Sequence, residues 1–322
     1  MRIRPRRLRQ SKAVRSLVAE TTIRPSDFLV PLFIVEGTGV KDEIPSMPGY
    51  YRYSLDRLAE ELSELDALGL HSVLLFVKVP DERKDNEGVE ALRSDGLMQE
   101  SIRTIKETYP HFTVMSDIAM DPYSSYGHDG IVEHGEILND ATVELLCQMS
   151  VSHAAAGVSF VAPSDMMDGR IGAIRDALDG AGFDQVGIMA YSAKHASAFY
   201  GPFRDALDSA PGFGDKKTYQ MDPANRIEAL KEAFLDESEG ADIVMVKPGL
   251  PYLDILWQVK EQSSVPVAVY QVSGEYAMIK AAAAAGWLDG EATMMEAVLS
   301  LKRAGADIIA SYFAKDVCKL LS

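Results

Sequence analysis

The feature that most constrains the fold of this chain is a repeated unit, in which an amphipathic helix and a glycine precede a short apolar run rich in β-branched residues. In one such unit a helical stripe of leucines follows Ser54, and Gly69 precedes the apolar run 73–77. Serine is favoured as a helix N-cap and glycine just after a helix, so the sequence marks both ends of this helix. This order is typical of parallel strands joined by crossover helices.

Eight apolar runs of this kind follow one another along the chain. Eight βα units predict a closed barrel, because an open doubly wound sheet usually has fewer strands and a glycine-rich phosphate turn, and none follows the first run here. We therefore predict an α/β fold, a (β/α)8 TIM barrel over residues 29–322 with an extended N-terminal arm over residues 1–28. The expected strands are 32–35, 73–77, 113–116, 158–162, 186–190, 243–246, 267–270 and 308–311.

The predicted arm is strongly basic. Residues 1–15 contain seven arginines and lysines and no acidic residue, while the whole chain has a net charge of −16, which leaves −23 for the rest. The strongly negative charge of the chain after residue 15 disfavours nucleic-acid binding. The arm has three interpretations, a solvated tail, a transit peptide or a basic strap on the acidic surface of another subunit, and composition alone favours the tail.

Composition also bears on location and redox chemistry. No uncharged apolar run reaches about 18 residues, and the basic start of the chain has no apolar signal segment, so we expect a cytoplasmic protein without membrane contact. Cys147 and Cys318 are the only cysteines, and neither has a partner at metal-ligand spacing, which disfavours disulfides and cysteine zinc sites. Cys147 lies on an apolar helical stripe and is expected to be a core thiol.

Polar side chains follow six of the predicted strands, at the end of the barrel where active sites form. A single strand-end lysine or serine commonly has a structural role, as a snorkelling side chain or a helix cap. Two lysines on strands about 4.8 Å apart would each lower the pKa of the other, and a neutral amine is a nucleophile for ketones. The pattern therefore predicts Schiff-base chemistry on one or two keto substrates. The six residues are Asp117, Ser164, Lys194, Lys247, Ser273 and Tyr312.

Residues 195–226 form a segment too long and too rich in glycine and proline for a simple connection, which is typical of a lid. Its cationic and amide groups are suited to binding a carboxylate as the lid closes. A solvated surface loop is the alternative, but such a loop gains nothing from aromatic residues. The cationic and amide side chains are Arg204, Lys216, Lys217 and Gln220, and the aromatic ones are Phe199, Tyr200, Phe203 and Phe213.

A second loop, 117–130, places Asp121 and Asp129 near Asp117 in the sequence. These carboxylates could bind a hard cation or assist proton transfer, although aspartates that form turns explain the pattern equally well. His128 is a further candidate ligand in this loop.

Five motifs closely resemble those of the delta-aminolevulinic acid dehydratase, or porphobilinogen synthase, family, and the resemblance covers essentially the whole chain. They are APSDMMDGR at 162–170, YSAK at 191–194, FYGPFR at 199–204, MVKPG at 245–249 and QVSGEY at 271–276.

The resemblance implies a lyase that condenses two molecules of 5-aminolevulinate into porphobilinogen for heme biosynthesis, with loss of two waters and without an organic cofactor. It implies that Lys247 forms a Schiff base with the substrate destined for the propionate side, and that Lys194 holds the second substrate. It also implies a homo-octamer in which the arm embraces a neighbouring subunit. The remaining substrate-binding positions are Ser273 and Tyr312 for the first carboxylate, Arg204, Lys216 and Gln220 for the second, Phe203 in the lid, and Asp117 and Ser164 beside the amines.

The metal expected from the resemblance is Mg²⁺ rather than zinc. Zinc-dependent members have three cysteines in the loop after the third strand, and this chain has Ala119, Asp121 and Asp129 there. It is similar to members in which magnesium acts as a stimulatory or allosteric ion away from the chemistry, at a position that matches Glu232 with Asp165 in its outer shell. Oxygen ligands and retained waters suit that ion. Whether Asp121 and Asp129 bind a cation stays open.

Two other functions are compatible with parts of the pattern. A class I aldolase of another family would share the barrel and a Schiff-base lysine, but it would not need two strand-end lysines with separate carboxylate-binding groups. A nucleic-acid binder could use the basic arm, although the acidic body opposes it.

Overall fold

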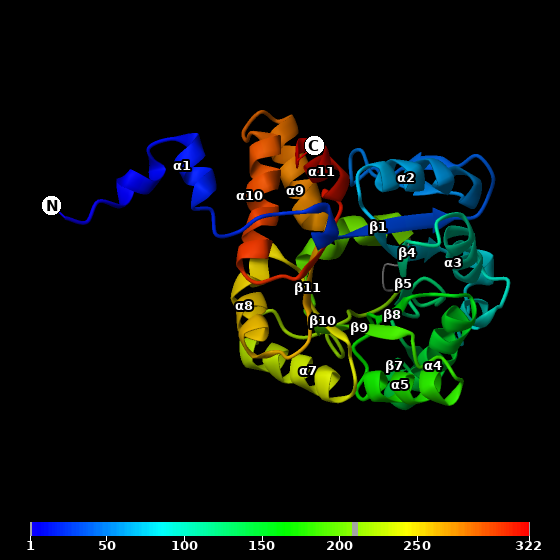
Figure 1. Cartoon of the computed structure of the whole chain (residues 1–322). Coiled ribbons are helices and arrows are strands. Elements are labelled where there is room, and N and C mark those ends of the chain that lie inside the picture. The colour runs from blue at the N-terminus through cyan, green and yellow to red at the C-terminus, as the bar shows by residue number, and fades with distance from the viewer. Residues whose placement is uncertain (1, 208–211, 322) are drawn as a thin grey trace.

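Eight parallel strands pair in chain order, and the last pairs with the first, which closes the sheet into a barrel. The computed structural model describes residues 2–207 and 212–321. Figure 1 shows the strands as an inner ring with the helices around it, so the predicted (β/α)8 fold is confirmed. The barrel strands are β1 (Phe28–Val35), β4 (Ser72–Lys78), β5 (Thr113–Ile118), β8 (Phe160–Pro163), β9 (Gly187–Lys194), β10 (Ile243–Lys247), β11 (Val267–Gln271) and β12 (Ile308–Ser311).

The outer layer consists of helices that bury one face against these strands. Strands covered on both sides become continuous apolar runs, and every residue of β10 is buried. The helices around the barrel are α2 (Leu55–Ala67), α3 (Leu97–Thr108), α4 (Asn139–Ala155), α5 (Arg170–Gly180), α7 (Arg226–Ser238), α8 (Leu253–Gln262), α9 (Ser273–Ala284), α10 (Gly290–Arg303) and α11 (Ala314–Leu321).

Helix α2 shows how the repeated unit works. Leu58, Leu62 and Leu65 form its buried stripe, and Gly69 follows with a φ of +73°, a left-handed conformation that favours glycine. Ser54 precedes the helix as predicted, but it does not cap it, because its hydroxyl accepts a hydrogen bond from the backbone N–H of Val40 instead (2.9 Å).

Several strands are longer than their apolar runs. Strand β9 continues four residues beyond the predicted 186–190 and ends at Lys194, and β10 ends at Lys247 itself. Asp117 lies within β5. These polar residues therefore belong to the strands rather than to the loops after them, because a polar side chain at a strand end leaves the backbone pairing intact.

Two hairpins lie outside the repeated unit and were not predicted. Strand β2 (Lys41–Glu43) pairs with β3 (Tyr51–Tyr53), which extends the sheet beside β1. Strands β6 (Ile131–Glu133) and β7 (Glu136–Leu138) form the second hairpin, after the 117–130 loop. Each strand has three residues, too few for a clear alternating pattern.

The N-terminal arm projects from the barrel beyond α10 in Figure 1. It contains a 3-10 helix, Pro5–Arg9, and the short helix α1 (Lys12–Leu17), and neither element has a buried residue. Leu17 is 84% exposed. Contact of the arm with a neighbouring subunit stays a prediction.

The remaining compositional expectations concern membranes and cysteines. Among residues 2–207 and 212–321, no helix has the length and apolar character needed to span a membrane. Cys147 is half-buried against the core, as expected, and neither it nor Cys318 forms a disulfide.

Candidate active site

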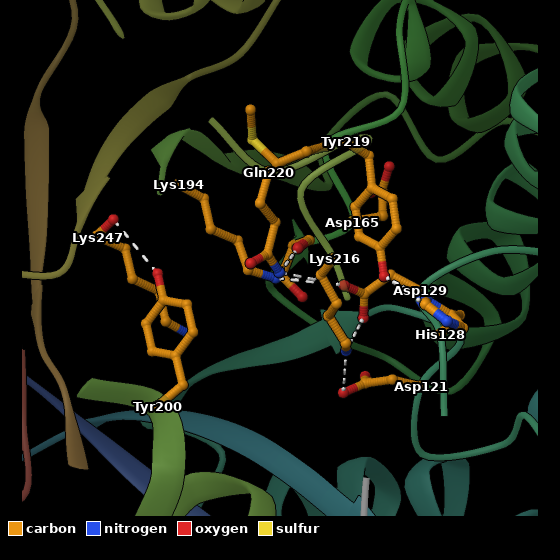
Figure 2. Close-up of polar contacts among 12 residues, drawn as sticks. Asp121, His128, Asp129, Asp165, Lys194, Tyr200, Lys216, Tyr219, Gln220 and Lys247 are labelled. Carbon is orange, nitrogen blue, oxygen red and sulfur yellow. Dashed lines mark hydrogen bonds and ion pairs between the residues drawn. The ribbon is translucent and has the colours of Figure 1, made fainter. Parts of the chain in front are cut away.

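Lys194 and Lys247 end adjacent barrel strands and are direct partners in the β9–β10 register. Both side chains are buried. Figure 2 shows them with the acidic and lid residues that surround them. The structure therefore brings together the two lysines that the sequence singled out.

The amine of Lys247 is enclosed by aromatic rings. Its Nζ lies 4.4 Å from the ring centroid of Tyr270 and 5.0 Å from that of Tyr191, with Tyr200 and Phe203 at 5.3 and 5.1 Å. Aromatic faces attract a cation, but burial penalises it more, and the nearby charge of Lys194 acts in the same direction. Together burial and this charge lower the pKa of Lys247 to about 7. A large fraction of this amine is therefore neutral and nucleophilic near neutral pH.

Lys194 has polar surroundings. Its amine donates a hydrogen bond to the backbone carbonyl of Ser164 and lies 3.8 Å from Oδ2 of Asp129. The two lysines thus occupy different environments, one aromatic and one anionic.

Asp117 is a buried carboxyl group near both amines. Burial and then the charge of Asp121 raise the pKa of Asp117 to about 7, while Lys194 and a hydrogen bond with Ser164 oppose this rise. Its Oδ1 atom has no hydrogen-bond partner within the described structure. A carboxyl group with a pKa near neutrality is suited to accept and return a proton.

Lys216 reaches from the lid into the site and lies between two carboxylates. Its Nζ is 3.3 Å from Oδ2 of Asp121 and 3.1 Å from Oδ1 of Asp129. Burial alone would raise the pKa of Asp129, but Lys216 and Lys194 outweigh it and lower that pKa. For Asp121 burial dominates, and its pKa is raised. The ammonium of Lys216 thus supplies a positive charge between the two carboxylates, and the binding of a further cation by Asp121 and Asp129 stays a prediction.

Two further residues fix the lid against the 117–130 loop. The amide of Gln220 donates to Oδ2 of Asp129 (3.4 Å). The ring of His128 contacts the hydroxyl of Tyr219 through Nδ1 (3.1 Å) and the carbonyl of Phe213 through Nε2 (3.0 Å). Because both ring nitrogens have partners, His128 holds the lid in position, and this arrangement does not favour it as a metal ligand.

A small cavity of about 30 Å³ joins both lysines to the lid. This space holds only about one or two waters, so the side chains that line it must move before a larger molecule can bind. Residues 208–211 of the predicted lid lie outside the described residues. The cavity is lined by Asp121, Lys194, Tyr200, Phe203, Arg204, Lys216, Gln220 and Lys247.

Ser273 and Tyr312 do not line this cavity. The hydroxyl of Ser273 accepts a hydrogen bond from the backbone N–H of Phe203 (2.9 Å), and the hydroxyl of Tyr312 is 2.9 Å from that of Tyr270. Both residues thus contact residues whose rings enclose the Lys247 amine, Phe203 through its backbone and Tyr270 through its hydroxyl. A movement of the helix α6 (Gly201–Leu207), which carries Phe203, would therefore expose the Ser273 hydroxyl.

Glu275 is a site residue to which the sequence reasoning gave no role. Its carboxylate accepts hydrogen bonds from the backbone N–H groups of Gly249 (3.1 Å), Leu250 (2.7 Å) and Val272 (2.7 Å). It thereby ties the loop after Lys247 to the start of α9, where Ser273 lies. A glutamate in the first turn of a helix was the available signal. The rings of Tyr191 and Tyr270 were also missed, because buried strand tyrosines look like ordinary core residues.

Glu232 and Asp165 lie away from this cavity. Glu232 is on α7, half-buried, and lines a groove of about 920 Å³ that also includes Asp168 and the lid residue Gln220. Burial and then the charge of Asp236 raise its pKa. Asp165 is fully buried, its Oδ2 has no hydrogen-bond partner among the described residues, and burial raises its pKa to about 6. Glu232 and Asp168 line the groove with oxygen ligands of the kind that Mg²⁺ prefers, whereas Asp165 does not line it, so the magnesium site stays a prediction.

Arg170 pairs with two acidic residues near Glu232, namely Asp236 and Asp165. Its guanidinium donates two hydrogen bonds to Asp236 (2.5 and 3.0 Å) and lies 3.8 Å from Oδ1 of Asp165. Glu232 and Asp168 line the groove, whereas Asp165 and Asp236 do not.

Comparison with known proteins identifies the family of this chain. The family model described as delta-aminolevulinic acid dehydratase matches residues 2–320. The chain is 52% identical to a delta-aminolevulinic acid dehydratase of Halalkalibacterium halodurans over 99% of this chain and 97% of that protein. It is 55% identical to a chloroplastic delta-aminolevulinic acid dehydratase of Glycine max over 99% and 77% of the two chains.

A solved structure is similar throughout. The crystal structure of delta-aminolevulinic acid dehydratase (porphobilinogen synthase) from Toxoplasma gondii, in complex with the reaction product porphobilinogen, matches with a TM-score of 0.97 and 50% identity over 99% of this chain and 92% of that chain. The chain therefore belongs to the delta-aminolevulinic acid dehydratase family.

Proposed function

We propose that this protein condenses two molecules of 5-aminolevulinate into porphobilinogen, in tetrapyrrole biosynthesis, and that Lys247 and Lys194 each form an imine with one substrate. The observation that carries this proposal is the register of the two lysines, by which an amine with a pKa of about 7 and a second amine line one small cavity. Family membership supplies the substrate.

The proposed reaction steps follow from the different surroundings of Lys247 and Lys194. The neutral amine of Lys247 adds to the ketone of one substrate, and loss of a water gives an imine. An imine acidifies the neighbouring C–H bonds, and Asp117, with its pKa near 7, accepts the proton that leaves as an enamine forms. Carbon–carbon and carbon–nitrogen bonds to the second substrate then close the ring and free both lysines, with two waters lost overall. Holding two identical molecules in opposite orientations is the main contribution of the barrel.

The lid binds one substrate carboxylate, and two residues outside the lid bind the other. Arg204 and Lys216 reach the cavity from the lid together with Gln220, which suits them to a carboxylate on the Lys194 side. Ser273 and Tyr312 bind the other carboxylate once Phe203 has moved. The small cavity supports an opening and closing cycle, because neither substrate enters the closed form.

Ancillary parts of the proposal concern magnesium, assembly and location. A hydrated Mg²⁺ binds at Glu232, with Asp165 as an outer-shell group, and no step of the reaction requires it.

The basic arm binds an acidic surface of a neighbouring subunit, as in a homo-octamer, and its exposure supports this role. We place the protein in the cytoplasm, as expected from its sequence.

The direct experiment is incubation of the purified protein with 5-aminolevulinate, followed by a colour assay for pyrrole. We expect porphobilinogen to form, and Lys247→Ala to remove at least about 10³-fold of the rate, as for loss of a covalent nucleophile. Lys217→Ala is the matched control and should retain the rate. The sequence grouped this lid lysine with the candidate carboxylate-binding side chains, but it is exposed, pairs with Asp215 and does not line the cavity. Absence of pyrrole with a folded protein at several pH values would contradict the proposal.

A further inference from the structure

We propose that Asp66, His71 and His111 form a binding site for a divalent transition-metal ion at the end of the barrel opposite to the catalytic lysines. His71 comes directly before β4, and His111 lies two residues before β5. Asp66 is in the last turn of α2. All three therefore lie at the N-terminal end of the barrel strands, whereas Lys194 and Lys247 end theirs.

The potential ligand atoms already converge. Nε2 of His71 is 3.1 Å and Nε2 of His111 is 2.8 Å from the same oxygen of Asp66, Oδ1. One ligand atom from each residue lies within 4.8 Å of the others. Metal–ligand bonds of about 2.0–2.1 Å in a tetrahedron separate ligand atoms by about 3.4 Å. The ion would thus replace two hydrogen bonds with small adjustments of three side chains.

The backbone holds both histidines in position. Ser72 and Thr113, which follow the histidines at the starts of β4 and β5, are direct partners in the sheet. The N–H of Thr113 donates to the carbonyl of His71 (2.8 Å). Phe112 is buried and packs against both imidazoles, with ring centroids 5.5 Å from His71 and 5.1 Å from His111. A site supported by rigid strands is preorganised, which reduces the cost of ordering its ligands.

The donor set indicates the class of ion. Two imidazole nitrogens and one carboxylate oxygen suit Zn²⁺, Co²⁺ or Ni²⁺, whereas Mg²⁺ and Ca²⁺ prefer oxygen ligands alone. The three side chains are each 41–50% exposed, which leaves water access to the remaining coordination positions.

This inference is independent of the proposed function, because none of the three residues takes part in the condensation. The competing explanation is a surface ion pair in which two histidines share one carboxylate. The two explanations differ in one respect: an ion pair needs no metal, and a metal site binds one equivalent of ion per chain that depends on both histidines.

The test is titration of the full-length protein with Co²⁺ in the presence of excess Mg²⁺, which occupies sites made of oxygen ligands alone. We expect one equivalent with visible absorption typical of nitrogen ligation, and we expect His71→Ala/His111→Ala to lose that equivalent. His134→Ala is the matched control, since His134 is an exposed histidine of the β6–β7 hairpin and does not belong to the proposed site. It should bind Co²⁺ as the wild type does.

Porphobilinogen formation by each variant checks its fold, and both variants should be as active as the wild type. As a second readout, Zn²⁺ should raise the melting temperature of the wild type and of His134→Ala, but not that of the double variant. An equal Co²⁺ equivalent in the double variant, or no bound Co²⁺ in the wild type, would overturn the proposal.

Discussion

Lys247 lies directly opposite Lys194 across β10 and β9, yet the two amines have different neighbours. Four aromatic rings surround the first, and a backbone carbonyl and a carboxylate lie beside the second. Burial and the charge of Lys194 act together on Lys247 and bring its pKa to about 7. The same residue type at the same level of the barrel is therefore prepared for two roles.

The pH dependence of imine formation follows from this pair. The pKa of Lys247 is lowered, so the neutral amine predominates above about pH 7, and protonation below it removes the nucleophile. We expect trapping at Lys247 to fall as the pH falls through 7. In Lys194→Met the positive charge is absent, so the midpoint should move to higher pH, although burial still keeps it below the usual value for lysine. An unchanged midpoint, measured by borohydride trapping across pH, would contradict the coupling.

The contact of Lys216 with Asp121 and Asp129 predicts a stability change that can be separated from activity. Lys216→Met leaves Asp121 without its cation and Asp129 with only the Lys194 amine, 3.8 Å away, which should lower the free energy of unfolding by about 3 kcal/mol. Adding Asp121→Asn should restore part of this stability but none of the activity, because the group for the substrate carboxylate is still missing. Denaturant unfolding and the pyrrole assay measure the two effects. Equal stability of Lys216→Met and the wild type would argue against a closed, ion-paired lid.

The groove beside α7 predicts a metal response. We expect activity to survive zinc-selective chelation, because Asp121 and Asp129 hold Lys216 and soft thiolate ligands are absent. Magnesium should stimulate the wild type, and the stimulation should vanish in Glu232→Ala. Glu228→Ala is the control, as an exposed glutamate on the same helix and groove. A stoichiometric zinc requirement, or stimulation that persists in Glu232→Ala, would refute this assignment.

The arm predicts an assembly change. Deletion of residues 1–15 should give smaller particles in light scattering and lower activity, because the basic arm would no longer bind the acidic neighbour. A variant of full length with its seven basic residues changed to glutamine separates charge from length, and it should show the same loss at physiological salt. An unchanged particle mass in the deletion variant would contradict the assembly proposal.

Much of the fold was accessible from the sequence because helix periodicity, glycine stops and apolar runs agree in each βα unit. The short hairpins β2–β3 and β6–β7 were not, because three-residue strands have no distinct period. Ser54 was assigned to a cap from residue type alone, and only the fold shows that the backbone of Val40 competes for its hydroxyl.

Some residues of the candidate site could be predicted from the sequence and others could not. Lys194 and Lys247 could be paired from the sequence because strand order fixes which strand ends are adjacent. The roles of Tyr270 and Glu275 could not be predicted, since a buried tyrosine and a helical glutamate are common and only their distances to the Lys247 region distinguish them. The position of Lys216 between two carboxylates likewise depends on how the lid folds back.

The most direct test of the central claim is borohydride reduction in the presence of 5-aminolevulinate, followed by mass mapping. An imine at Lys247 would be reduced to a stable secondary amine, so the substrate mass should appear on the peptide that contains residues 245–249, and Lys194 should label as the second site. Lys247→Ala and Lys247→Arg should abolish both this adduct and turnover, because guanidinium stays protonated and forms no imine. Lys217→Ala should label as the wild type does. Near-normal porphobilinogen formation by Lys247→Ala, or an adduct confined to a lysine outside β9 and β10, would contradict the account.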